Sequence, residues 1–349
     1  MNKIPKRIYI AGFPCLYGGA GTELLHQIYL WRYMGLEIHL IPTNSYGYQQ
    51  MDMICEMQRQ QVYMHPIRQW DVLRPGDPVF GFCNTEYLDQ LPEIRQYTKR
   101  TVFINCMTWL FPQEKKAMER GMIPLFLYQN EDVRQKVMPE LKSLNPDPSI
   151  QFFTFNPYFR LEDFPFVEER SSDFFGCGRI SRQDSDKFAA DTLKIYEYFV
   201  SPVPKRGIFL GFDDRSEKKV GKPMEWIRTA YDQNVISQQD FYKHCKIILQ
   251  PTDTVENWPR IGFEAMSSGS VLIVDNRGGW RQMVKHGKTG WLCNNERDFI
   301  YYASKMAYEP NLRDDMAYAA RENCLKMCGL DVSVGSWHEV MEIISNLPE

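Results

Sequence analysis

The segment KIILQPTDTVENWPRIGFEAMSSG, residues 246–269, joins a short apolar run, a polar loop and a helical pattern. The apolar run 247–249 predicts a buried strand. Pro259 suits the first position of a helix, where a missing N–H costs nothing, and Gly269 suits its end. Open parallel sheets present free backbone N–H groups to phosphates at such strand–loop–helix junctions. The segment therefore predicts an α/β fold with a ligand site at this loop.

Two carboxylates flank the start of this predicted helix. Glu256 lies in the loop, and Glu264 follows it with seven residues between them. At about 3.6 residues per turn, Glu264 shares a helix face with Arg260 and Ile261. A carboxylate near a phosphate is repelled unless it binds a neutral group, and sugar hydroxyls fit because a carboxylate can accept from two of them. Taken alone, such a pair of glutamates is more often the solvated face of an amphipathic helix.

Three motifs occur in an order that resembles a known family. Glu256 and Glu264 with the following AMSSG resemble the E-x7-E signature of retaining glycosyltransferases of family 4, the glycosyl transferases group 1. Residues 270–292, SVLIVDNRGGWRQMVKHGKTGWL, are similar to that family's strand, Gly-Gly turn and G-x-x-G-x-L ending. Residues 177–187, CGRISRQDSDK, are similar to its phosphate-binding segment. The resemblance implies the GT-B fold, in which two Rossmann-like, doubly wound parallel-sheet domains face a cleft.

The length and patterning of the chain also predict two domains. Its 349 residues exceed the size at which a single core stops growing. Strand and helix patterns alternate in both halves, which favours doubly wound parallel sheets. We expect an N-terminal acceptor-side domain over 1–160 and a C-terminal donor domain over 161–332. The resemblance implies that the final amphipathic helix, 333–349, returns to the first domain.

Local patterns predict individual elements within these domains. Thr22 is expected to cap a helix that runs to Met34, and Ser237 with Asp240 resembles a capping box. Residues 213–222 read as a charged loop, and a helix is expected around 187–199. The expected strands are 7–11, 37–41, 79–83, 102–105, 125–128, 174–178 and 208–211.

The composition excludes several classes of protein. The formal net charge is −3, so no global basic field is present for nucleic acid or an anionic membrane. The apolar run 8–13 is too short for a signal peptide, and no run approaches the ~20 apolar residues of a transmembrane helix. Nine scattered cysteines lack the paired spacing of a zinc site. We expect reduced thiols, a cytoplasmic protein and no metal.

The glycine-rich segment GGAGTE, residues 18–23, has several interpretations. It is not a P-loop, since no Gly-Lys-Ser/Thr follows, and it lacks the full nicotinamide fingerprint. A plain tight turn is one interpretation. The resemblance implies another, a loop whose backbone approaches the donor diphosphate at Gly19 and Gly21, with Thr22 and Glu23 on the acceptor side.

The resemblance also implies roles for residues of the second half. Arg179 and Lys187 would bind the donor diphosphate, although Arg182 could substitute for either. Glu264 would bind the ribose and Glu256 the donor sugar, with a Glu256 nucleophile as the sharper alternative. The family often has a glycine where this chain has Pro259, which cannot donate a hydrogen bond. The first amides available to the diphosphate are then those of Arg260 and Ile261, and Arg260 adds its charge.

The activity implied is metal-independent, retaining transfer from a nucleotide-diphosphate sugar, with no cofactor. Glu256, Arg179 and Lys187 are the catalytic candidates, because the leaving diphosphate gains charge that cations stabilise. The family often carries a histidine in its first domain, where this chain has CMTW at 106–109. Trp109 is therefore an acceptor-side candidate. The acceptor stays open between saccharide, lipid-linked glycan, small molecule and modified nucleic-acid base. A sugar-nucleotide epimerase and a noncatalytic sugar-nucleotide-binding protein are the alternatives.

Overall fold

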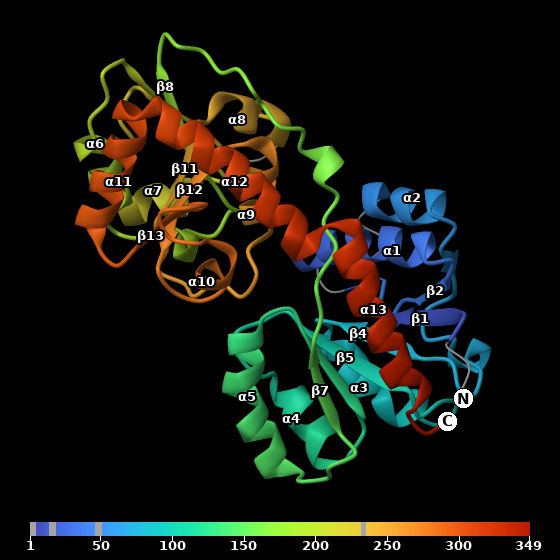
Figure 1. The fold of residues 1–349 in the computed structure, drawn as a ribbon. Helices are drawn as coiled ribbons and strands as arrows, with labels where there is room; N and C mark the ends of the chain where they lie inside the picture. Colours follow the sequence, from blue (N-terminus) through green and yellow to red (C-terminus); the bar gives the residue numbers. More distant parts are fainter. Residues whose placement is uncertain (1–4, 14–18, 46–50, 232–234) are drawn as a thin grey trace. The chain divides into compact units, whose positions relative to one another are not determined.

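The computed structural model describes residues 5–13, 19–45, 51–231 and 235–349. The chain forms two compact units and passes between them twice (Figure 1). Unit 1 comprises Met1–Phe159 together with Cys328–Glu349, and unit 2 comprises Arg160–Met327.

Unit 1 is built on a seven-stranded parallel sheet. Its strand order is β3-β2-β1-β4-β5-β6-β7, so the direction of winding reverses between β1 and β4. This is the doubly wound order of a Rossmann-like domain with one additional edge strand. The strands are β1 (Arg7–Ala11), β2 (Glu37–Ile41), β3 (Tyr63–Met64), β4 (Val79–Phe82), β5 (Thr101–Asn105), β6 (Leu125–Tyr128) and β7 (Gln151–Thr154).

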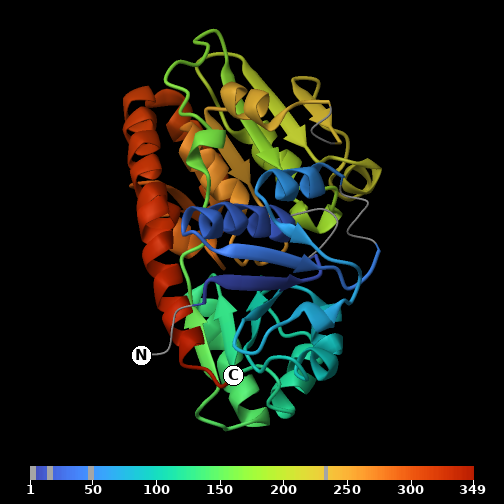
Figure 2. The same ribbon diagram turned by 90° about the vertical axis from the view of Figure 1, so that its right-hand side faces the viewer.

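Helices cover both faces of this sheet, so its strands β4, β5 and β6 are buried on both sides, whereas the edge strands β3 and β7 are partly exposed. One face carries α1 and α13, and the other carries α3, α4 and α5. The helix α13 lies beside α1 although it comes from the end of the chain (Figure 2). The helices of unit 1 are α1 (Gly19–Tyr33), α2 (Met51–Arg59), α3 (Thr85–Ile94), α4 (Pro112–Glu119), α5 (Glu131–Leu144) and α13 (Leu330–Ser345).

Trp337 fixes α13 to unit 1. Its side chain is fully buried and meets the ring of Trp31 edge-on at 4.9 Å between ring centroids. Its indole Nε1 donates to Gln27 at 2.7 Å, and the same core contains Phe80 and Phe155. The apolar spacing of the last helix is thus explained by its burial in the core of the first unit.

Unit 2 repeats the same plan with six parallel strands. The order β10-β9-β8-β11-β12-β13 reverses between β8 and β11, which is again the Rossmann order. The strands are β8 (Phe175–Ile180), β9 (Lys205–Leu210), β10 (Ile227–Ala230), β11 (Ile247–Gln250), β12 (Val271–Asp275) and β13 (Gly290–Cys293). The helices are α6 (Thr192–Tyr198), α7 (Asp214–Val220), α8 (Gln238–His244), α9 (Arg260–Ser268), α10 (Trp280–Met283), α11 (Glu296–Tyr308) and α12 (Pro310–Cys328).

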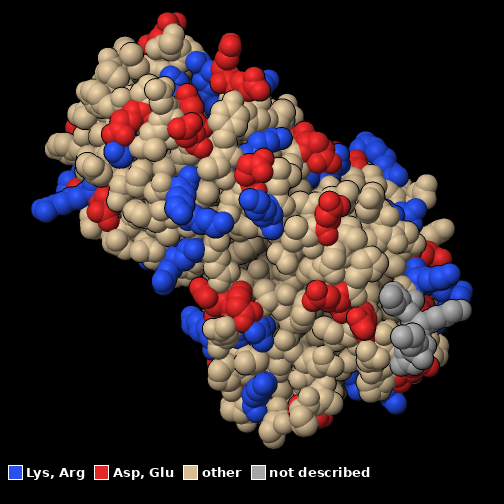
Figure 3. All heavy atoms as spheres, viewed as in Figure 1, with Lys and Arg blue, Asp and Glu red and all other residues tan. Residues whose placement is uncertain are grey.

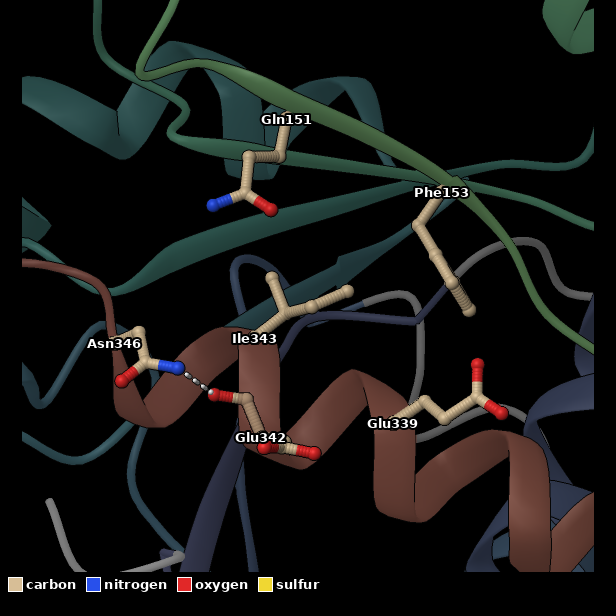
Figure 4. Close-up of a pocket in the computed structure, with 6 residues that line it drawn as sticks. All are labelled: Gln151, Phe153, Glu339, Glu342, Ile343 and Asn346. Atoms are coloured by element: carbon tan, nitrogen blue, oxygen red, sulfur yellow. Dashed lines mark hydrogen bonds between the residues drawn. The ribbon is translucent and has the colours of Figure 1, made fainter. Parts of the chain in front are cut away.

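The edge strand β7 and the helix α13 line a surface hollow of ≈ 290 Å³ (Figure 4). Phe153 extends from the strand toward the helix, and Glu339 and Glu342 lie along the helix. None of the residues proposed from the sequence lines this hollow. It belongs to the junction of sheet edge and terminal helix.

Three sequence predictions about local structure need correction. Residues 213–222 contain α7, since the Asp213 side chain accepts from the backbone N–H of Ser216 at 2.9 Å and so caps a helix. Thr22 lies inside α1, which already begins at Gly19. Pro259 occupies the N-cap of α9 and Arg260 its first helical position. The capping role of Ser237 is confirmed, because its side chain accepts from Asp240 N–H at 3.0 Å.

Within the described part of the chain, no helix is long and apolar enough to cross a membrane.

Candidate functional site

The reversal of strand order in unit 2 marks where a ligand is expected. In open α/β sheets ligands bind outside the carboxyl ends of the strands at this switch point. Here the two central strands, β8 and β11, end side by side. The Gln250 side chain accepts from Ile180 N–H at 3.2 Å and donates to Ile180 C=O at 2.9 Å. This pair of hydrogen bonds holds the two strand ends together beneath the loops that follow them.

Three loops meet at this edge of the sheet. Lys187, in a short 3-10 turn (Ser185–Lys187) after β8, forms an ion pair with Glu256 of the loop after β11 at 2.7 Å. Gly279, in the loop after β12, donates its backbone N–H to Glu256 C=O at 2.8 Å. A Cβ atom at Gly279 would lie 1.9 Å from Asn257 O, so the close approach of the two loops requires glycine there.

Arg179 lies beneath these loops and is fully buried. Its guanidinium carbon lies 3.3 Å from the ring centroid of Phe188, and Nη2 donates to Lys187 C=O. Nε and Nη1 have no hydrogen-bond partner among the residues that the structure describes. Burial lowers the pKa of Arg179 to about 9, opposed by the charges of Tyr196, Glu256 and Asp275. A buried guanidinium with two unused donors is suited to an anion that is not part of the protein.

Further unpartnered polar atoms lie on the loops at this edge of the sheet. Buried polar groups in folded proteins are nearly always hydrogen-bonded, so each exception needs an explanation. In the described part of unit 2, the buried atoms without a partner include four on the loops after β8, β11 and β12. They are Ser181 Oγ, Thr254 Oγ1, Trp258 Nε1 and Arg277 Nε. All four can donate a hydrogen bond.

Glu264 lies in α9 and is almost completely buried. One carboxylate oxygen accepts from the Tyr242 hydroxyl at 2.9 Å and from Gln238 at 3.4 Å. The other accepts no hydrogen bond from any described residue. Burial raises the pKa of Glu264 to about 7, against the opposing effects of the Tyr242 hydrogen bond and the Arg260 charge. The carboxyl group therefore has one oxygen available for a hydroxyl.

The first turn of α9 contains Arg260 and Ile261. Both follow Pro259, whose backbone is extended, and Arg260 is buried. The first N–H groups of a helix have no acceptor inside it. Gly269 ends the helix, as predicted, and its backbone is left-handed with φ 79°.

Two residues of this edge were not identified from the sequence. Asp275, at the end of β12, accepts from Thr252 N–H at 3.0 Å, and burial raises the pKa of its carboxyl group. Arg277 follows two residues later and donates to Thr252 C=O. Their position directly after an apolar run and before the Gly-Gly turn was the available signal.

A hollow of ≈ 470 Å³ lies at the same edge of the sheet, at the ends of β9 and β10. Its lining combines the aromatic rings of Phe212 and Tyr231 with carboxylates of the first turn of α7. None of the site residues predicted from the sequence lines this hollow.

The proposed residues of unit 1 lie at different depths. Gly19 is exposed at the start of α1, and Gly21 is buried in its first turn. Thr22 is exposed, whereas Glu23 is 1% exposed and accepts from Gln27 at 2.6 Å. Trp109 is 53% exposed in the loop after β5. Gly18 of the same motif lies outside the described residues.

The structure thus brings together Arg179, Lys187 and Glu256, and it places Glu264, Arg260 and Ile261 on one helix. Among the described residues there is no group of His, Cys, Asp and Glu side chains that could hold a metal ion. On the face shown in Figure 3, basic and acidic side chains are interspersed.

Comparison with known proteins points to a family. Residues 226–323 match the model of the family Glycosyl transferases group 1. This segment runs from the start of β10 into α12, so it contains the Glu256 loop, α9 and the Gly-Gly turn. No curated protein matches the chain in sequence.

Solved structures with the same fold cover nearly the whole chain. A glycosyltransferase from Rickettsia africae has a TM-score of 0.75 at 12% identity over 98% of this chain and 100% of its own. TarM has a TM-score of 0.75 at 10% identity over 98% and 99%. HepE from Anabaena, solved with UDP and glucose, has a TM-score of 0.72 at 11% identity over 97% and 99%. The chain therefore has the two-domain, Rossmann-like GT-B fold, as the sequence predicted.

Proposed function

We propose that this protein is a glycosyltransferase that moves a sugar from a nucleotide-diphosphate sugar to an acceptor hydroxyl, with retention of configuration. The family match over residues 226–323 supports sugar transfer. The GT-B fold supports it as well, since HepE of that fold was solved with UDP-glucose. The single observation that carries the proposal is the buried Arg179, with two unused donors at the switch point of unit 2.

In this proposal the donor diphosphate binds above Arg179, Lys187 and the start of α9. As the glycosidic bond breaks, negative charge develops on the leaving diphosphate. Fixed cations and helix N–H groups stabilise that charge, so the reaction needs no metal. Lys187 already lies 2.7 Å from Glu256, which keeps its charge compensated before the diphosphate arrives.

The two glutamates divide the recognition of the donor. Glu264 uses its free oxygen for the ribose, and Glu256 binds hydroxyls of the sugar ring. Glu256 is held for this purpose from both sides, by the Lys187 ion pair at its carboxylate and the Gly279 N–H at its carbonyl. The first unit supplies the acceptor side, with Thr22, Glu23 and Trp109 as candidates, and the backbone at Gly19 and Gly21 approaches the donor diphosphate. The acceptor itself is an unidentified hydroxyl compound.

Calorimetry on two variants tests this division. Glu264→Gln is expected to weaken both the free nucleotide diphosphate and its sugar conjugate, because ribose is common to both. A hydrogen bond to a charged group contributes about 1.5–3 kcal/mol, which corresponds to a loss of roughly tenfold or more in affinity. Glu256→Gln is expected to spare the free nucleotide and to weaken only the conjugate or its turnover.

The ligands for this experiment come from a thermal-shift screen of UDP, GDP and ADP with their glucose conjugates. Glu296→Gln is the matched control, since Glu296 pairs with Lys194 on the surface of the same unit at 2.8 Å. Equal losses for both ligands in both variants would show that the carboxylates only support the fold, and would overturn the proposal.

The stereochemistry and metal requirement need separate measurements. Product formed from an α-linked donor is expected to be α-linked by NMR, and turnover is expected to persist in EDTA. Isomerisation of the donor without an acceptor would instead identify an epimerase. Donor binding without turnover on any of a panel of acceptors would identify a noncatalytic binding protein.

A further inference from the structure

One tryptophan of unit 1 differs from the other tryptophans of the chain in its exposure. All eight lie in the described ranges, and Trp109, with 53% of its surface accessible, is the only exposed one among them. It lies in the loop between the end of β5 and the start of α4, at the carboxyl edge of the sheet, where α/β proteins bind ligands. Tryptophan is enriched among the residues that carry binding energy.

The side chain of Asn105, the last residue of β5, fixes the backbone of this loop. Asn105 is 1% exposed. Its Oδ1 accepts from the backbone N–H of Met107 at 2.7 Å, and its Nδ2 donates to Trp109 C=O at 3.1 Å. These two hydrogen bonds join the start of the loop to the residue that carries the exposed indole.

Glu114 of α4 holds the Asn105 side chain in this orientation. Its carboxylate is fully buried and accepts from Asn105 Nδ2 at 2.9 and 3.2 Å and from the backbone N–H of Phe111 at 3.1 Å. Because a carboxylate only accepts, the amide must turn its nitrogen toward Glu114 and its oxygen toward Met107. Burial raises the pKa of Glu114 to about 7, against the opposing hydrogen bonds from Phe111 and Asn105.

A buried carboxylate is more than the start of α4 requires. Burying a charge is costly, and a neutral serine or asparagine at the N-cap would satisfy the first N–H groups of a helix. Here the N-cap is Phe111, whose side chain makes no capping hydrogen bond, and Glu114 binds Asn105 as well. The cost of burial thus goes into holding the loop. A group that is held before its ligand arrives loses little conformational freedom on binding.

From the exposure of Trp109 and the hydrogen bonds that join its loop to Asn105 and Glu114, we propose that Trp109 is a stacking surface for a sugar ring of the acceptor. Asn105 and Glu114 are its positioning residues. The C–H groups of a pyranose form an apolar face that packs on a flat aromatic ring, while its hydroxyls stay in water. The inference assigns the acceptor to the saccharides, and its role as an acceptor rests on the proposed function.

A glycan array tests the stacking surface with the full-length, fluorescently labelled protein. Wild type is expected to bind glycans on the array, and Trp109→Ala is expected to bind them roughly tenfold more weakly or worse. Trp109→Tyr keeps an aromatic face and should retain part of the binding, whereas Trp109→Leu, which is apolar without a flat ring, should not.

Fluorine NMR of protein labelled with 5-fluorotryptophan tests the positioning residues. The signal that is missing in Trp109→Tyr belongs to Trp109, and the best glycan from the array is expected to shift it. In Glu114→Gln the new amide nitrogen must face one of two donors, Asn105 Nδ2 or the Phe111 N–H, so one attachment of the loop is lost. This variant is expected to broaden or split the Trp109 signal alone and to weaken glycan binding.

The exposed Glu119 of the same helix supplies the matched control, since Glu119→Gln should leave all eight signals and the glycan binding unchanged. The stacking surface is rejected if wild type binds no glycan on the array, or if Trp109→Ala binds as tightly as wild type. The positioning roles are rejected if Glu114→Gln keeps wild-type glycan binding, or if it shifts all eight signals, which would indicate a general effect on the fold.

A parallel thermal-shift measurement with UDP-, GDP- and ADP-glucose separates this inference from the proposed function. Wild-type protein that binds a nucleotide sugar and no glycan would refute the inference alone. Protein that binds glycans through Trp109 and no nucleotide sugar would refute the transferase and leave a saccharide-binding loop.

Discussion

Arg179 shows how much of the site rests on a single side chain. The sequence placed it at the end of a strand, and the structure adds that it is fully buried against Phe188. Burying a charge is costly unless it is compensated. Two of its three nitrogens lack a partner among the described residues, which makes Arg179 the residue whose replacement should matter most for an anionic ligand.

Replacing Arg179 with alanine is expected to weaken donor binding by roughly tenfold or more, since a charge-assisted hydrogen bond contributes about 1.5–3 kcal/mol. Calorimetry with the best nucleotide sugar from the thermal-shift screen measures the loss. Arg182→Ala is the control, because Arg182 is exposed and pairs with Asp184 at 3.0 Å in the same loop. An Arg179→Ala protein that is folded and binds the donor as tightly as wild type would place the diphosphate elsewhere.

Glu264 allows a prediction about pH. Its folded-state pKa of about 7 lies above the ordinary value of 4.5, so the folded state binds the proton more tightly than the unfolded state. The stabilisation of the fold by proton binding at Glu264 is complete below about pH 4.5 and is lost as the pH rises through 7. At 1.36 kcal/mol per pKa unit, the free energy of unfolding falls by about 3 kcal/mol over this range.

Between pH 5 and pH 8, the free energy of unfolding of the Glu264→Gln variant is therefore expected to fall less than that of wild type. Urea unfolding of both proteins at several pH values measures the slope of the free energy of unfolding against pH. Glu296→Gln, on the surface of the same unit, should keep the wild-type slope. If Glu264→Gln keeps it too, the carboxyl group is not held neutral in the fold.

At the scale of elements, sequence patterns predicted strands better than helices. The strands β1, β2 and β6 have the predicted bounds, because short buried strands leave an uninterrupted apolar run. The helix α7 was not recognised in its charged sequence, since it depends on the Asp213 cap and buries only one residue, Ser216. The 19 residues of α12 were not predicted, although they form the longest helix of unit 2.

The pattern around α9 was informative because several local signals agreed: an apolar strand, a proline, paired carboxylates and a terminal glycine. The sequence could not show which loops contact one another. Lys187 and Glu256 are 69 residues apart, and only the adjacency of β8 and β11 brings them together. Arg277 and Asp275 reach the same edge through β12; their position after an apolar run indicates the end of a strand, but not that this strand lies next to β11.

Gly279→Ala is expected to disturb the contact between the loop after β12 and the loop after β11. The added Cβ would lie 1.9 Å from Asn257 O, and φ at Gly279 is −61°, so the effect is steric and free of backbone strain. The loop that carries Glu256 must shift, which should weaken the sugar conjugate more than the free nucleotide diphosphate in calorimetry.

Gly335→Ala is the matched control, because no atom lies within 4 Å of its added Cβ in α13. Alanine is favoured over glycine inside a helix by about 0.5–1 kcal/mol, so this variant should be as stable as wild type or more. Unchanged binding of both ligands by Gly279→Ala would mean that the contact between the two loops has no part in donor recognition.

At the scale of the whole molecule, the sequence predicted two Rossmann-like sheets, and the structure has them, with the order 3-2-1-4-5-6 in unit 2 and the same order plus a seventh edge strand in unit 1. Right-handed crossovers restrict the possible topologies, but more than one doubly wound strand order satisfies them, so the alternation of patterns does not determine the order. The return of the last helix was implied only by resemblance. The amphipathic pattern of α13 shows that it must bury one face, and cannot show against which sheet.

The last prediction concerns this returning helix. Trp337→Ala removes a fully buried indole that contacts Trp31, Phe80 and Phe155 and leaves the side chain of Gln27 without its donor. Truncating a buried aromatic side chain costs about 3–5 kcal/mol, so unit 1 should unfold at clearly lower urea concentration. Trp109→Ala, which changes a largely exposed tryptophan of the same unit, should leave the unfolding midpoint close to that of wild type. Trp109→Ala should instead raise the KM for the acceptor if Trp109 lies on the acceptor side. A Trp337→Ala protein with the wild-type midpoint would show that residues 330–345 do not contribute to the core of unit 1, because a packed indole cannot be removed from a core without cost.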